Sequence, residues 1–143
     1  MKQRLDCILL IDDDEATNFL SNIIIEEAAC TLNIKTKQTG KAALIYLTDS
    51  SLLTHKNNKA PFPDLIFLDI NMPAMDGWEF LAKYKELKNN LAHTPIIIML
   101  STSLNPDDKL KALNIPEVSD FHYKPITPEM IDTIVTEYFP DYV

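Results

Sequence analysis

Carboxylates, a hydroxyl and an amine stand directly after short apolar runs at four places in the sequence. Clustered carboxylates repel one another unless a cation joins them, and Mg²⁺ prefers such oxygen ligands. A carboxylate beside a bound divalent metal can act as a nucleophile toward a phosphoryl group. The residues in question are Asp12 and Asp13 after the first run, Asp69 after the third, Ser101 and Thr102 after the fourth, and Lys124 after the fifth.

These residue types together suit phosphoryl transfer, in which positioning and charge neutralisation supply most of the catalysis. Asp69 would be the nucleophile, and Lys124 with the metal would supply positive charge to the phosphoryl oxygens. The Ser101 hydroxyl and backbone N–H groups of the adjacent turn would donate hydrogen bonds to the same oxygens.

The apolar runs alternate with segments of helical periodicity, which predicts five strands and five helices. Alternation at this spacing implies parallel strands joined by right-handed crossovers, hence a doubly wound α/β sheet with helices on both faces. Ligands bind such sheets outside the carboxyl ends of the strands, so the polar residues should meet at one edge. We expect strands at 5–11, 32–39, 65–68, 96–100 and 118–123, and helices over 15–29, from 40, from 77, from 106 and from 128.

Four of the five predicted helices carry an apolar stripe, and several begin at a recognisable start signal. In the first, Leu20, Ile23, Ile24 and Ala28 recur at helical spacing and predict its apolar face. Asp14 is interpreted as a helix start, Asp76-Gly77 as turn and capping chemistry, and Asn105-Pro106 as a strong helix start. The other predicted faces are Ala43, Leu44 and Leu47; Phe80, Leu81, Tyr84 and Leu87; and Ile131, Ile134, Val135 and Tyr138.

Residues 50–63 lose this periodicity and are polar and proline-bracketed, which predicts a surface loop. Cys7 and Cys30 are too few for a disulfide framework or metal cluster, and we expect both to be small buried hydrophobes. His55, His93 and His122 show no ligand spacing, and we expect them at the surface or in loops.

Composition excludes two classes of partner. The net charge is −8 and the 13 Lys and Arg residues are dispersed, which argues against nucleic acid. The longest apolar run, 96–100, is too short to cross a bilayer, and the N-terminus carries no signal-peptide pattern. We therefore expect no membrane contact and a cytoplasmic protein.

Four segments resemble the signatures of bacterial response-regulator receiver domains, over about residues 5–138. The resemblance implies a flavodoxin-like fold with strand order 2-1-3-4-5. It also implies one receiver domain over residues 1–143, and because nothing follows Val143 we expect no output domain. The segments are Leu9–Asp14, Leu65–Gly77, Ser101-Thr102 and Lys124-Pro125.

The resemblance assigns roles at the predicted sheet edge. Asp69 resembles the phosphoacceptor, and Asp12 and Asp13 resemble the acidic pair. With Asp69 and the backbone carbonyl of Asn71, that pair would hold Mg²⁺ or Mn²⁺. Lys124 resembles the invariant lysine, which would be followed by a cis peptide bond.

Two further residues resemble the switch positions, and both depart from the usual pattern. Ser101 stands where Thr is commoner, and adjacent Thr102 leaves the register open by one residue. Phe121 stands where Tyr is common and lacks its hydroxyl. On phosphorylation Ser101 would move toward the phosphoryl group and Phe121 would turn inward. The loop before the third strand is also longer than usual.

The resemblance implies a phosphorelay switch that catalyses only its own phosphorylation and dephosphorylation. The donor would be a sensor histidine kinase or a histidine phosphotransfer protein. A downstream protein would bind the surface made by the fourth helix, fifth strand and fifth helix, and a homodimer is also possible.

Two other classes compete with this interpretation. An enzyme could turn over a phosphorylated metabolite through an aspartyl phosphate, but Asn71 stands where such an enzyme needs a second carboxylate, and no cap domain is evident. A protein-binding module could keep the fold without the chemistry, but every key position is filled.

Overall fold

The computed structural model describes residues 3–53 and 60–142. Five strands and five α-helices alternate along the chain, as the periodicity predicts. The strands are β1 (Ile8–Ile11), β2 (Ile34–Lys37), β3 (Leu65–Asp69), β4 (Ile96–Ser101) and β5 (Asp120–Tyr123). The helices are α1 (Glu15–Ala28), α2 (Gly40–Leu53), α3 (Gly77–Leu87), α4 (Pro106–Leu113) and α5 (Pro128–Tyr138), with a 3₁₀ turn at Lys88–Asn90.

The strands form one parallel sheet in the order β2-β1-β3-β4-β5, which confirms the predicted fold. The order reverses between β1 and β3, which are paired so that Ile11 lies opposite Leu68. The next residues, Asp12 and Asp69, are therefore neighbours across two strands. This switch point is where doubly wound sheets bind their ligands.

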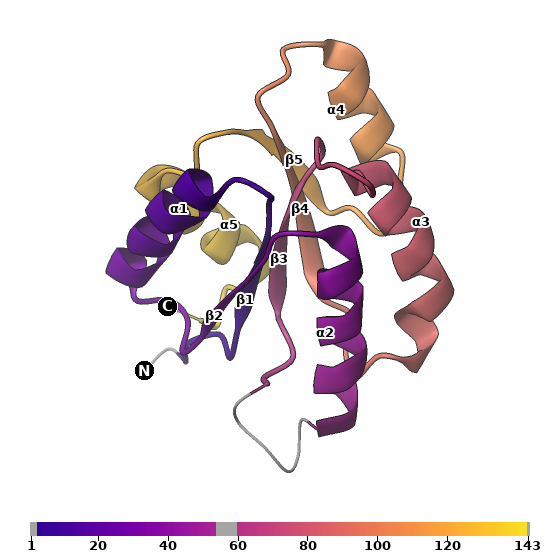
Figure 1. Cartoon of the computed structure of the whole chain (residues 1–143). Helices are drawn as coiled ribbons and strands as arrows, with labels where there is room; N and C mark the ends of the chain where they lie inside the picture. Colours follow the sequence, from indigo (N-terminus) through magenta and orange to yellow (C-terminus); the bar gives the residue numbers. More distant parts are fainter. Residues whose placement is uncertain (1–2, 54–59, 143) are drawn as a thin grey trace.

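Two helical layers cover the sheet (Figure 1). α2, α3 and α4 pack on one face over a core that includes Phe80, Tyr84 and Met99. α1 and α5 pack on the other face over a core that includes Phe67 and Ile131. Both faces of the central strands are buried, which explains why those strands are almost wholly apolar.

Several predicted boundaries shift in the structure. α2 continues through Leu53, so the predicted loop at 50–63 begins too early, and residues 54–59 lie outside the described part. Ser50 is fully buried in that helix and donates to the Leu47 carbonyl, a helical contact that hides its polarity. His55 also lies outside the described residues. His122 is not in a loop, because it belongs to β5.

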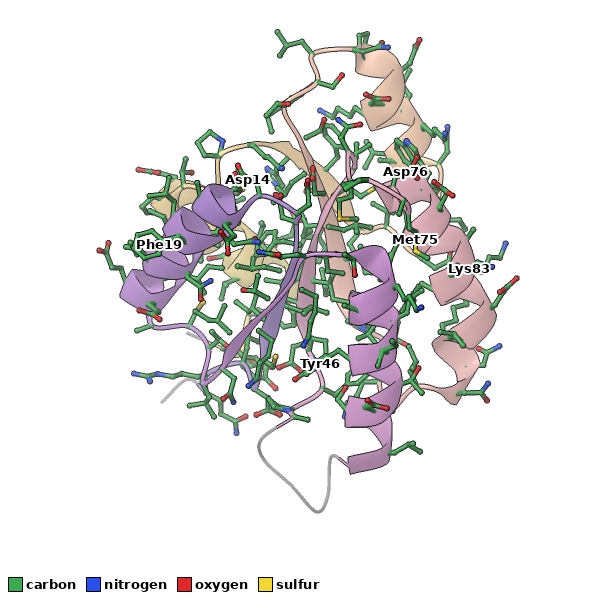
Figure 2. The ribbon with its side chains drawn as sticks, in the orientation of Figure 1. Asp14, Phe19, Tyr46, Met75, Asp76 and Lys83 are labelled. Carbon is green, nitrogen blue, oxygen red and sulfur yellow. The ribbon has the colours of Figure 1, made fainter. Side chains whose placement is uncertain are left out.

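The predicted face of α1 is only partly confirmed, because Ile24 and Ala28 pack against the core but Leu20 and Ile23 are exposed. Its buried residues are Asn18, Ser21 and Ile25, whereas Leu20 is 60% exposed and Phe19 stands outward (Figure 2). The stripes predicted for the other helices are confirmed for their principal residues, which are Ala43 and Leu47 in α2, Phe80, Leu81 and Tyr84 in α3, and Ile131, Ile134 and Val135 in α5.

The two cysteines are free and buried, as predicted. Within residues 3–53 and 60–142, no helix has both the length and the apolar character needed to span a bilayer.

Candidate functional site

Three carboxylates meet at the carboxyl edge of the sheet. Asp12 follows β1, Asp13 comes next, and Asp69 is the last residue of β3. One oxygen from each lies within 4.8 Å of the others. Asp12 and Asp69 are buried and Asp13 is exposed, so the group opens to solvent on one side. The sequence prediction that these three side chains converge is confirmed.

Lys124 joins two of these carboxylates. Its Nζ donates to Asp12 Oδ2 at 2.6 Å and lies 2.9 Å from Asp69 Oδ1. Lys124 comes directly after β5, and its backbone N–H donates to the Ser101 carbonyl at the end of β4. The peptide bond to Pro125 is cis, as predicted. Strand pairing at the sheet edge therefore sets the position of the ammonium group.

The start of α1 holds Asp12. Its Oδ1 accepts a hydrogen bond from the Asp14 N–H at 3.0 Å, and its carbonyl accepts one from Asn18 Nδ2 at 2.8 Å. Asp14 caps the helix by accepting from the Ala16 N–H. Sequence reasoning identified the Asp14 cap but missed Asn18. The available signal was a polar residue spaced with Ser21 and Ile25 along one helix face.

Gly77 allows α3 to begin close to Asp69. A Cβ at this position would lie 2.7 Å from the Asp69 carbonyl oxygen and 2.9 Å from the Ile70 Cα. The Gly77 N–H donates to the Ile70 carbonyl at 2.8 Å. Both obstructing atoms belong to the backbone and cannot rotate away. The sequence predicts only turn chemistry at Gly77, whereas the close approach of the two backbones is its stronger requirement.

The loop between β3 and α3 is fixed at both ends. Asp76 and Glu79 form a reciprocal capping box at the start of α3, which confirms the predicted cap. Met75 packs against Gly40 at the start of α2 (Figure 2 labels Met75 and Asp76). Ala74 takes a left-handed conformation with φ of 67°. Asn71 lies in this loop, two residues beyond Asp69.

The predicted switch residues differ in their surroundings. Ser101 ends β4, is fully buried, and its Oγ accepts a hydrogen bond from the Ser103 N–H. Thr102 is exposed. Phe121 is 4% exposed and already faces the core, with its ring edge-on to Tyr123 at 5.3 Å. Phe121 is therefore already buried in this conformation, so the predicted inward turn would not begin from an exposed side chain.

Burial and charge act in opposite directions on the cluster. Burial raises the pKa of Asp69, and the neighbouring Asp12 charge raises it further, although hydrogen bonds from Lys124 and Asn71 act against this. Burial alone would lower the pKa of Lys124, but its contacts with Asp12 and Asp69 outweigh burial and raise it. The ammonium group therefore stays charged at neutral pH and partly compensates the carboxylates.

The donor set suits a hard divalent cation. All three side chains offer oxygen ligands, and an exposed opening at Asp13 leaves room for the waters that Mg²⁺ retains. Lys124 alone cannot balance three ionised carboxylates. The residues present therefore fit Mg²⁺ or Mn²⁺, with Asp12, Asp13 and Asp69 as the ligands that the cluster offers.

Comparison with known proteins agrees with this geometry. The family model of the response regulator receiver domain matches residues 8–136. A probable methanogenesis regulatory protein, FilR2 of Methanothrix harundinacea, is 30% identical over 130 residues, which is 91% of this chain and 79% of that protein. The response regulator Rcp1 of Synechocystis is 30% identical over 108 residues, 76% of this chain and 69% of that one.

Solved structures give the same result. A two-component response regulator from Cytophaga hutchinsonii superimposes with a TM-score of 0.82 and 30% identity, over 94% of this chain and 97% of that one. The Mn²⁺-bound form of Rcp1 shares the fold with a TM-score of 0.67 and 24% identity, over 94% of each chain. The chain belongs to the response regulator receiver domain family of two-component signalling proteins.

Proposed function

We propose that Asp69 is the phosphoacceptor of this receiver domain and that Lys124 is its charge partner. The observation that carries the proposal is the 2.9 Å contact between Lys124 Nζ and Asp69 Oδ1, in a cluster with Asp12 and Asp13. Asp69 is the only one of the three carboxylates that lies in a strand, where backbone pairing fixes its direction.

The reaction joins Asp69 to a phosphoryl group carried by a histidine. A carboxylate oxygen of Asp69 forms a bond to phosphorus while the bond between phosphorus and the histidine nitrogen breaks, and the released imidazole takes up a proton. Lys124 neutralises charge on the transferred group, which is the main task in phosphoryl transfer. The donor is a histidine kinase or a phosphotransfer protein, the partners that receiver domains have.

Asp12, Asp13, Asp69 and the backbone carbonyl of Asn71 would hold Mg²⁺ or Mn²⁺. When bound, the metal supplies positive charge to the phosphoryl oxygens. The Mn²⁺-bound form of Rcp1 supports this choice of ion. In this proposal the domain catalyses only its own phosphorylation and dephosphorylation and is no enzyme for a separate substrate.

The buried hydroxyl of Ser101 is proposed as the group that moves toward the new phosphoryl oxygens. Phe121 already occupies the core beside Ala112 and Val118. Phosphorylation would then stabilise the buried position of Phe121 rather than create it, by holding Ser101 on the site side of β4.

The output surface is proposed on α4, β5 and α5. Leu104, in the loop before α4, is 86% exposed, and Leu110 and Leu113 on α4 and Tyr123 on β5 are also exposed. Apolar side chains that gather in solvent indicate a protein-binding surface.

We propose that residues 1–143 act as one receiver domain in the cytoplasm. The domain would signal through a protein, or a second copy of this chain, bound at the surface of α4, β5 and α5. The net charge of −8 argues against a nucleic-acid partner.

The test is phosphorylation of the purified protein by a small phosphodonor such as acetyl phosphate, followed by mass spectrometry. We expect one added phosphoryl group in the presence of Mg²⁺ and none with a chelator. Asp69→Asn should abolish the addition, and Lys124→Ala should reduce it strongly.

Asp14→Asn is the matched control, because Asp14 neighbours the acidic pair but serves as a helix cap, a role that Asn fills equally well. This variant should be phosphorylated normally. A stable phosphoryl group on the Asp69→Asn protein would refute the assignment, and steady release of phosphate from phosphomonoesters would favour a metabolic enzyme.

A further inference from the structure

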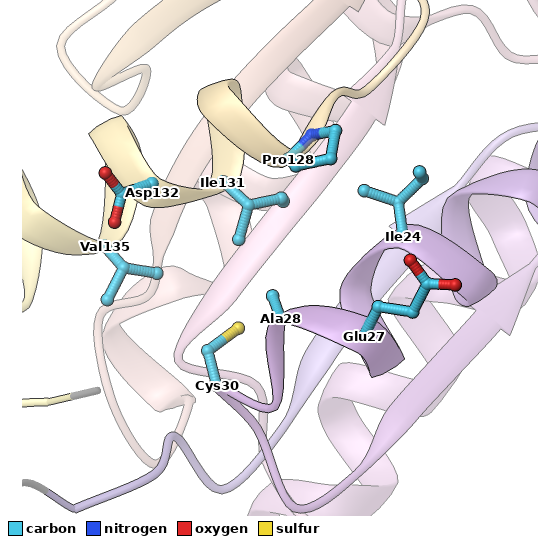
Figure 3. Close-up of a pocket in the computed structure, with 8 residues that line it drawn as sticks. All are labelled: Ile24, Glu27, Ala28, Cys30, Pro128, Ile131, Asp132 and Val135. Atoms are coloured by element: carbon cyan, nitrogen blue, oxygen red, sulfur yellow. The ribbon is translucent and has the colours of Figure 1, made fainter.

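A cavity of about 370 Å³ lies between α1 and α5, on the sheet face away from α2 and α3. Figure 3 shows Ala28 and Cys30 facing Ile131 across it. Its volume falls in the range of about 300–1,000 Å³ typical of small-molecule sites. The cavity shares no lining residue with the Asp12, Asp13 and Asp69 cluster.

The floor of the cavity is apolar. Ile131 and Val135 are buried and supply it from α5, and Ile24 and Ala28 supply it from α1. Cys30 closes one end with a thiol that is 2% exposed, and burial raises the pKa of that thiol, so it stays neutral. Branched carbons and a polarisable sulfur suit a hydrocarbon chain rather than a sugar or a nucleotide.

The rim of the cavity is acidic. Glu27 on α1 and Asp132 on α5 stand on opposite sides of the apolar floor (Figure 3). Neither carboxylate forms an ion pair within 4.0 Å among the described residues.

The helices that form the walls extend this negative field. α1 and α5 each carry three acidic residues and no Lys, Arg or His along their whole length. The six are Glu15, Glu26 and Glu27 on α1, and Glu129, Asp132 and Glu137 on α5. An apolar recess inside a purely acidic surface complements a ligand with a hydrocarbon body and a cationic head.

We propose that the α1–α5 cavity is a binding site for small amphiphilic organic cations of the alkylammonium class. The hydrocarbon chain lies on Ala28, Ile131 and Val135, and the ammonium group lies at the rim, in the negative field of Glu27 and Asp132. The recess is open to solvent, but its volume lies at the lower end of the small-molecule range, which favours a small molecule over a basic partner helix. This site is separate from the phosphoacceptor site, so each can fail independently of the other.

The experiment titrates ¹⁵N-labelled protein with three probes of equal chain length: n-hexylammonium, n-hexanol and hexanoate. Saturating Mg²⁺ is present so that the ammonium group does not compete for Asp12, Asp13 and Asp69. We expect n-hexylammonium to bind at least about tenfold more tightly than either other probe. Its chemical-shift changes should centre on the backbone amides of Ala28, Cys30 and Ile131.

Two double variants distinguish the effect of the rim carboxylates from the effect of the protein's overall negative charge. Glu27→Gln with Asp132→Asn keeps the shape of the rim and should weaken n-hexylammonium by about tenfold while leaving n-hexanol unchanged. The matched control, Glu26→Gln with Glu137→Gln, removes the same charge from the same helices outside the lining, and should change affinity by less than about twofold.

Three results would overturn the proposal. The first is equal affinity for all three probes, and the second is equal weakening by both double variants, which would indicate only the general field of an acidic protein. The third is binding of a basic peptide to this face without any binding of n-hexylammonium. Ala28→Leu, which fills the cavity while keeping every charge, provides a further check, because n-hexylammonium binding should then disappear.

Discussion

Helix α1 differs from helices α2 and α3, which lie on the opposite face of the sheet, in how well its sequence predicts its buried face. In α2 and α3, the apolar stripes that the sequence predicts supply the buried residues. In the other layer, α1 turns Asn18 and Ser21 inward and leaves Phe19, Leu20 and Ile23 in solvent. Core packing orients α2 and α3, whereas α1 is held by the site as well as by the core, because Asp14 caps it and Asn18 donates a hydrogen bond to the Asp12 carbonyl.

This contrast shows that hydrogen bonds to a site can orient a helix together with its apolar contacts. This orientation leaves an apolar strip of α1 exposed to water. Such a strip is unfavourable unless it binds a partner or is shielded from solvent. Substitutions that compare the two layers test this interpretation, beginning with the one expected to have the largest effect.

Phe80→Ala removes a fully buried ring from α3 and should lower the free energy of unfolding by about 3–5 kcal/mol. Leu20→Ala on α1 should lower it by less than about 0.5 kcal/mol, because that side chain is already largely in water. Urea unfolding followed by circular dichroism measures both. Similar costs for the two variants would contradict the proposed difference between α1 and α3.

Gly77→Ala should lower the free energy of unfolding by about 1–3 kcal/mol, because the added Cβ meets the backbone of Asp69 and Ile70. The forced shift also moves the end of β3, so phosphorylation should slow. Ala82→Gly, on the exposed side of the same helix, is the control for helix propensity, with an expected cost of about 1 kcal/mol and normal phosphorylation. Unchanged stability of the Gly77 variant would show that the helix start is pliable.

Asp69→Asn should raise Tm at neutral pH in metal-free buffer. The folded-state pKa of Asp69 is raised, mainly by burial, so ionisation weakens the folded state. That loss is absent below the pKa of the unfolded chain and grows as pH rises through the folded pKa. The gain in Tm should therefore vanish in acid.

Asp14→Asn is the control of opposite sign for that measurement. A hydrogen bond from Thr17 is the main cause that lowers the pKa of Asp14, so its ionised form favours folding. This substitution should leave Tm at neutral pH unchanged or slightly reduced. A lower Tm for the Asp69→Asn protein at neutral pH would mean that the contact with Lys124 outweighs burial.

The smallest effects are expected at two alanines with left-handed backbone, one in each layer. Ala29 follows α1 with φ of 54°, and Ala74 precedes α3 with φ of 67°. Glycine takes this conformation without strain, so Ala29→Gly and Ala74→Gly should each stabilise the fold by about 0.5–1 kcal/mol. A loss of stability in either variant, measured by thermal unfolding, would show that the alanine methyl group makes useful contacts.

The periodicity of the sequence was sufficient to predict the alternating elements and the convergence of the carboxylates with Lys124, whereas the strand order came from the resemblance to receiver domains. Parallel strands end at a common edge, so residues that follow apolar strands meet whatever the details of packing. Asp12, Asp69 and Lys124 each stand at the carboxyl end of a strand, so they meet although they are far apart in the sequence.

The orientation of α1 could be predicted only in part from periodicity. An apolar stripe indicates a buried face only when burial alone decides the helix rotation, and here polar bonds at the first turns also contribute to it. Gly77 was seen as part of a turn, but its steric requirement depends on how closely two elements approach, which is a property of the folded backbone.

The bridge that Lys124 makes between Asp12 and Asp69 sets the charge that the site can accept. Three ionised carboxylates and one ammonium group leave two negative charges at the sheet edge. A divalent ion neutralises this remainder, whereas a monovalent ion leaves one charge and a trivalent ion exceeds it. Discrimination among divalent ions must then depend on radius and preferred coordination number, since their charges are equal.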